Sequence, residues 1–178
     1  VGFDERAFYH TLVPRYNKSI MNQSSLARWL RYLVYATAFV PLIIFSEYMS
    51  PFHFGKVIVL RSMVEVMLVL YVLLVWRDRS YLPPRHPILW GLLGFTGAFI
   101  LTTVTSVAPL QSFVGTLERM GGLWTFVHYM VYFVILISVM RTRAHWQSLI
   151  DVMIGVGVAS AFYGFLQKTN LEFILGSG

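Results

Sequence analysis

The fold class is decided by residues 56–76, which read KVIVLRSMVEVMLVLYVLLVW. Only Lys56, Arg61 and Glu65 carry a charge in this stretch, and a helix needs about 20 mostly apolar residues to cross a bilayer. Because lipid offers no hydrogen-bond partner to an unpaired backbone, a stretch of this kind must fold as a helix. We therefore predict a transmembrane α-helix here.

Similar apolar stretches recur along the chain. The predicted spans lie near residues 29–48, 56–76, 87–107, 121–140 and 146–167. Pro41 predicts a kink inside the first span, and Pro83, Pro84 and Pro87 end one helix and begin the next. The composition agrees, because 57% of the residues are hydrophobic and 12% are charged, whereas soluble domains carry about 25% charged residues. The sequence thus predicts an all-α, polytopic transmembrane bundle of five helices over residues 26–170. A cytoplasmic N-terminal segment (1–25) precedes it, and a short, truncated extracytoplasmic end (171–178) follows.

The basic residues are divided unevenly between the two sides of these spans. All but four of the 14 lysines and arginines precede the first span, lie in its first turn, or lie at the loops that follow the second and fourth spans. By the positive-inside rule, the N-terminus is cytoplasmic and the loop with Glu118 and Arg119 faces outward. The net charge of +6 does not gather into a basic stripe with interleaved aromatic residues, so we expect no nucleic-acid partner.

Glu118 and Arg119 form an adjacent acid and base inside the stretch GTLERMGG (115–122), directly before the fourth span. Charges at the mouth of a membrane helix are costly to keep near lipid without a use. The planar fork of an arginine suits the oxygens of a phosphate group, which it can bind in pairs. The pair is therefore a candidate substrate-binding site, the alternative being an exposed interfacial salt bridge that adds little to stability.

Three further polar side chains lie within the spans. Arg61 and Glu65 are four residues apart and share one helix face, where they can pair. Charges at this depth cost at least about 2.5–3.5 kcal/mol unless they are paired or hydrated, so they either lock the bundle or line a cavity. His128 is either functional or bonded to a neighbouring helix. We expect Arg61, Glu65, Glu118 and Arg119 to converge on one hydrated pocket open to the outer side.

Lys56 lies on the same outer side and would form a cationic patch with Arg61 and Arg119. The chain has no cysteine, and its histidines show no metal-ligand spacing. It also has no glycine-rich phosphate loop with its lysine and no HExxH motif. We predict no metal site and no cofactor.

Two stretches carry a resemblance to a known family. PFHFGK (51–56) leads into RSMVE (61–65), and SFVGTLERMGGLWT (112–125) is followed by His128 and Tyr129. Together they resemble the N-terminal half of the O-antigen ligase-like bacterial membrane proteins. The most specific part is the pattern Phe-x-Gly-x-x-Glu-Arg-x-x-Gly before an aromatic helix, and the likeness covers roughly residues 26 to 170.

The resemblance implies a multi-pass enzyme of the bacterial inner (plasma) membrane. Such proteins move a glycan from an undecaprenyl-pyrophosphate carrier to lipid A–core, a protein or another glycan at the outer face. The substrate-binding candidates are then Arg119, Glu118, Arg61, Lys56, Glu65 and His128. The family's catalytic arginine and histidine are expected beyond residue 178, because both ends of this chain look cut. We expect the fragment alone to be inactive.

Two other functions fit the same residues. A transporter segment would use Arg61, Glu65 and His128 along a polar pathway. A non-catalytic membrane scaffold would use the charged residues only to lock the bundle.

Overall fold

The computed structural model describes residues 25–43, 54–116 and 120–168. Within these residues every regular element is a helix, which confirms the all-α prediction. The elements are α2 (Ser25–Thr37), η1 (Val40–Leu42), α3 (Phe54–Arg77), η2 (Arg79–Tyr81), α4 (Pro87–Val104), α5 (Pro109–Val114), α6 (Leu123–Val139) and α7 (Arg143–Lys168). The predicted end at 171–178 and all of the predicted N-terminal segment except Ser25 lie outside the described residues.

Three helices are long and apolar enough to cross a membrane, and they make this a membrane protein. They are Gly55–Arg77, Pro87–Val104 and Arg143–Leu166. A fourth apolar helix, α6, lies where the fourth span was predicted but has only 17 residues. Among the described residues, therefore, the prediction of five spans is met in part.

The first predicted span, near 29–48, is not one continuous helix. Helix α2 has 13 residues and ends at Thr37, after which the 3-10 helix η1 contains Pro41. A proline lacks the backbone N–H, and its ring clashes with the carbonyl four residues earlier, which here belongs to Thr37. The kink predicted at Pro41 is therefore a helix end, and the last part of the predicted span lies outside the described residues.

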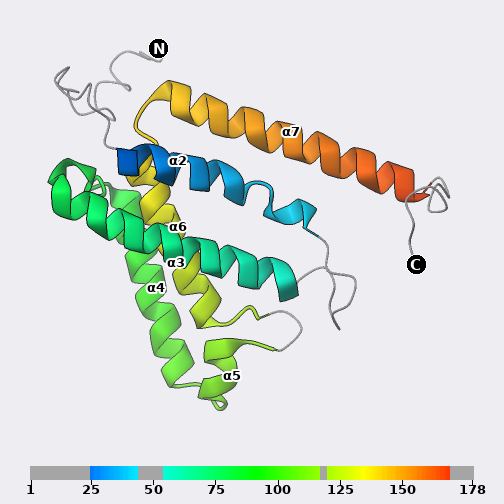
Figure 1. Cartoon of the computed structure of the whole chain (residues 1–178). Helices are drawn as coiled ribbons and strands as arrows, with labels where there is room; N and C mark the ends of the chain where they lie inside the picture. Colours follow the sequence, from blue (N-terminus) through cyan, green and yellow to red (C-terminus); the bar gives the residue numbers. More distant parts are fainter. Residues whose placement is uncertain (1–24, 44–53, 117–119, 169–178) are drawn as a thin grey trace, which may run out of the picture.

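Helix α3 lies at the centre of the structure (Figure 1). It packs against α2 and α6, whereas α4 packs against α5 and α6. Leu30 and Val34 of α2, Met67 and Leu74 of α3, and Ile135 and Val139 of α6 form the buried core between these helices. Helix α7 lies beyond α2 in Figure 1 and touches the rest of the chain mainly near its own beginning and at η1.

Polar contacts close the end of the core where α3 stops. The Tyr71 hydroxyl lies 3.0 Å from both the Tyr81 carbonyl oxygen and Ser138 Oγ, and so joins α3 to α6. The guanidinium of Arg141 lies 4.1 Å from the centre of the Tyr81 ring and donates to the Ser138 and Ser80 carbonyl oxygens. The turn between α6 and α7 is thereby tied to the turn that follows α3.

Candidate functional site

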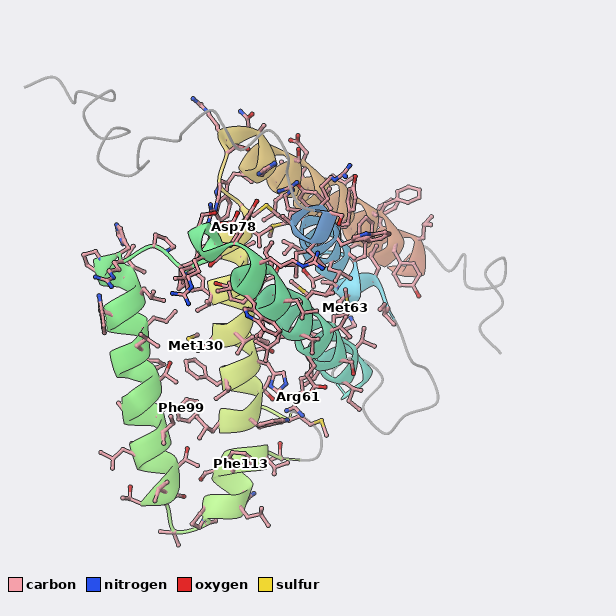
Figure 2. The ribbon with its side chains drawn as sticks, turned by 60° about the vertical axis from the view of Figure 1, so that its left-hand side comes forward. Arg61, Met63, Asp78, Phe99, Phe113 and Met130 are labelled. Carbon is pink, nitrogen blue, oxygen red and sulfur yellow. The ribbon has the colours of Figure 1, made fainter. Side chains whose placement is uncertain are left out.

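Arg61 joins α3 to the chain that leads into α6. Its Nη2 donates to the carbonyl oxygen of Met120 over 3.0 Å and also to Thr125 Oγ1. The Thr125 hydroxyl in turn bonds the same Met120 oxygen. Met120 directly follows Arg119, so this arginine of α3 holds the residue next to the acid–base pair that the sequence singles out. Figure 2 shows Arg61 close to the end of α6 at which these contacts are made.

Two glycines bring the segments on either side of Glu118 and Arg119 into direct contact. Gly115 has a φ of +87°, a conformation that favours glycine. A Cβ on Gly122 would lie 2.3 Å from the Phe113 carbonyl oxygen and 2.5 Å from the Gly115 nitrogen, so no side chain fits there. The Met120 amide also donates to the Thr116 carbonyl oxygen over 2.7 Å. These contacts form a closed stem.

The stem explains why glycines occur at these positions of the Phe-x-Gly-x-x-Glu-Arg-x-x-Gly pattern. They are needed for backbone geometry and close approach. Glu118 and Arg119, with Leu117, lie outside the described residues. Their predicted role in binding substrate therefore stays a prediction.

Glu65 pairs with His128 and not with Arg61. Its Oε1 lies 3.3 Å from His128 Nε2, the one ion pair within the part of the chain that the structure describes. Arg61 and Glu65 could pair along α3, but each has another partner. Met120 and Thr125 supply acceptors to the guanidinium of Arg61. His128 reaches the carboxylate of Glu65 from α6. His128 thus bonds the neighbouring helix α3.

The two ring nitrogens of His128 have different partners. Its Nδ1 lies 2.8 Å from the Trp124 carbonyl oxygen, which can only accept, so Nδ1 carries a proton. Its Nε2 faces the Glu65 carboxyl group at 3.3 Å. The His128 side chain is 7% exposed and that of Glu65 60%, so this pair lies at the edge of the α3–α6 interface.

Lys56 and Arg61 bond different parts of the chain. Its Nζ donates to the Pro41 carbonyl oxygen over 2.7 Å and so ties the beginning of α3 to η1. Arg61 is bound to the start of α6. These two members of the predicted patch serve different contacts, and the third, Arg119, lies outside the described residues.

A hollow of about 370 Å³ lies where α4, α5 and α6 meet. Phe99 and Ala108 line it together with Gln111, Ser112 and Thr116, and so do Gly115, Gly121 and Gly122. Figure 2 shows Phe99 between α4 and α6, where its ring lies 5.1 Å from that of Phe126. Neither Arg61 nor Glu65 lines this hollow, so it is not the shared pocket predicted around those two residues.

Helix α5 and the hollow that it helps to form were not predicted from the sequence. Pro109 in the first turn and Gly115 directly after Val114 were the available signals, because proline favours helix starts and glycine favours helix ends. Thr125 and the Met120 carbonyl oxygen were likewise not predicted as partners of Arg61. Within the described residues, no group of three His, Asp or Glu side chains could hold a metal ion.

The chain matches no protein-family model, and it matches neither a curated protein nor a solved structure.

Proposed function

We propose that this chain is the N-terminal membrane part of an O-antigen ligase-like glycosyltransferase. The full protein would move a glycan from an undecaprenyl-pyrophosphate carrier to lipid A–core, a protein or another glycan at the outer face of the bacterial inner membrane. The observation that carries the proposal is the bond from Arg61 to the carbonyl oxygen of Met120, the residue that follows Glu118 and Arg119 in the chain. The stem makes the glycines of the family pattern structural necessities, and this supports reading the pattern as a functional unit.

The chemistry assigns different roles to the two arginines. Negative charge develops on a pyrophosphate leaving group in the transition state, and positive charge placed nearby stabilises it. The guanidinium of Arg61 already binds Met120 and Thr125, so Arg61 positions the stem and Arg119 is the group that would contact phosphate. Glu118 would orient Arg119 or the acceptor. A base that takes the proton from the acceptor hydroxyl would lie outside residues 1–178.

The proposed topology follows from the basic residues. The N-terminus and the turns after α3 and α6 would be cytoplasmic, because Arg77, Arg79, Arg85, Arg141 and Arg143 cluster there. The stem with Glu118 and Arg119 would then face outward. This is the side on which a lipid-linked glycan is expected to be handed over.

A proton-coupled transporter segment is the second candidate. The pair of Glu65 and His128 favours it, because a carboxyl group and an imidazole in contact inside a membrane protein are typical parts of a proton pathway. Glu65→Gln separates the two candidates. It would abolish proton-coupled uptake in a transporter, whereas a transferase whose phosphate contact is Arg119 would keep most of its activity.

The central test is Arg119→Ala in the full-length protein. Loss of a charge that stabilises the leaving group should lower the rate of glycan transfer by about 10²–10³-fold, measured with purified lipid-linked glycan in proteoliposomes. Arg119→Lys keeps the charge without the fork and should fall in between. Arg143→Ala is the matched control, because Arg143 is an exposed arginine at the start of α7. Wild-type transfer by Arg119→Ala, with normal membrane insertion, would refute the assignment.

A further inference from the structure

The hollow at the meeting point of α4, α5 and α6 has a lining of mixed chemistry. Phe99 and Ala108 are apolar, whereas Gln111, Ser112 and Thr116 carry hydrogen-bonding side chains, and none of the lining residues that the structure describes is charged. Its volume of about 370 Å³ falls within the roughly 300–1,000 Å³ typical of small-molecule sites. The hollow therefore suits a small, uncharged ligand that has both an apolar face and hydroxyl groups.

Gly121 is the least expected residue in this lining. Gly115 and Gly122 are glycines because the stem requires them, but a Cβ on Gly121 would meet no atom within 4 Å. The backbone at Gly121 also has none of the positive φ values that favour glycine. Because Gly121 lines the hollow, glycine at this position leaves the backbone open to close approach by a ligand.

The polar groups of the lining are not equally available. The Ser112 hydroxyl lies 2.8 Å from Ser106 Oγ and is engaged within the protein. The side chains of Gln111 and Thr116 are exposed. An amide and a hydroxyl offer both donors and acceptors, which is what a ligand with several hydroxyl groups needs.

We propose that this hollow binds one uncharged sugar residue of a glycan, with the C–H face of the ring against Phe99 and Ala108. Its hydroxyls would bond Gln111, Thr116 and the backbone at Gly121. The choice of a carbohydrate rests on the proposed function, but binding does not require any transfer to occur. The hollow shares Gly121 and Gly122 with the stem whose Met120 is held by Arg61, so sugar and pyrophosphate would be bound by adjoining parts of one structure.

The test is saturation-transfer NMR on the full-length protein in lipid nanodiscs, which avoids detergents with sugar headgroups. The probes are glucose, galactose, N-acetylglucosamine and rhamnose, each measured separately, with glucuronate as the charged comparison. Wild-type protein should transfer saturation to at least one uncharged sugar. Gly121→Leu should weaken that binding at least about tenfold, and Gln111→Ala should weaken it by a smaller factor. Gly91→Leu on α4 is the matched control, because Gly91 also has nothing within 4 Å but does not line the hollow.

Three outcomes would overturn the proposal: no transfer to any uncharged sugar, transfer to glucuronate alone, or equal binding by wild type, Gly121→Leu and Gln111→Ala. If Gly121→Leu does not fold, Gln111→Ala decides alone. The result is independent of the Arg119 experiment. If the protein binds sugar but Arg119→Ala keeps full transfer activity, the sugar site stands and the proposed role of Arg119 is refuted. If no sugar binds but Arg119→Ala abolishes transfer, the role of Arg119 stands and the sugar site is refuted.

Discussion

Helices α6 and α7 are neighbours in the chain and both are apolar, yet they are packed very differently. α6 contacts α2, α3, α4 and α5, and its buried residues include Thr125, His128 and Ser138. In α7 the buried residues are Leu149 and Val156, both apolar. Apolar composition therefore identifies a membrane helix but does not tell which side packs against protein.

In this molecule, polar residues mark the side of a membrane helix that packs against protein. Each buried polar side chain of α6 is matched by a polar group on α3 or close to it: Thr125 by Arg61, His128 by Glu65 and Ser138 by Tyr71. Asp151 of α7, by contrast, is exposed. Because lipid is as apolar as leucine, polar contacts and close packing, rather than hydrophobicity, select the helix faces that meet.

The largest effect is expected from Gly122→Val, which would break the anchored beginning of α6. The added Cβ would collide with the backbone of Phe113 and Gly115, which cannot move aside as a flexible side chain could. We expect a loss of about 4 kcal/mol or more of stability, measured by thermal unfolding in nanodiscs. Gly121→Val is the control and should stay within about 0.5 kcal/mol, since a Cβ there meets nothing within 4 Å. Equal losses would mean that the stem does not depend on the close approach at Gly122.

A matched pair of methionines tests the difference between the packed helices and α7 directly. Met67 on α3 is 0% exposed and belongs to the core with α6, whereas Met153 on α7 is 58% exposed. Met67→Ala should cost about 2 kcal/mol, at the lower end of the range for buried methionines, because lipid contributes no hydrophobic drive. Met153→Ala should change stability by less than about 0.5 kcal/mol. Similar losses in steric-trap unfolding would show that α7 is packed as tightly as α3.

The smallest effect concerns the pair of Glu65 and His128. In a double-mutant cycle of Glu65→Leu and His128→Leu, the coupling free energy should be about 0.6 kcal/mol and at most about 1.7 kcal/mol, as for polar contacts between membrane helices. The losses of stability of the two single variants should add up to more than the loss of the double variant, since each single variant leaves one polar group without its partner. A coupling free energy of zero would mean that this contact does not help to hold α6 against α3.

The sequence was sufficient for elements whose causes are local. The long apolar run of α3 and the prolines before α4 predict where those helices lie, because length, hydropathy and missing N–H groups act within the segment itself. Pro41 was noticed as well, but whether it bends a helix or ends it depends on the contacts around it. Here Thr37 and Tyr132 are joined by a 2.9 Å bond at the point where α2 ends.

The site was harder to predict because its partners are distant in the chain. Arg61 and Glu65 lie one helical turn apart, so their pairing was the obvious hypothesis. The structure instead gives each a partner from α6 or the residues before it, which a single sequence does not reveal. Gly122 illustrates the same limit, since its need for glycine arises from Phe113 and Gly115 across the stem.

The distance between Glu65 and His128 along the chain also bears on how the protein enters the membrane. Glu65 leaves the ribosome 63 residues before His128, and at about 5–20 residues per second this delay lasts about 3–13 seconds. During that time α3 holds a carboxyl group and a guanidinium whose partners have not yet been made. We therefore expect α3 to reach its final contacts only after α6 emerges, which makes the pace of translation part of how this protein assembles.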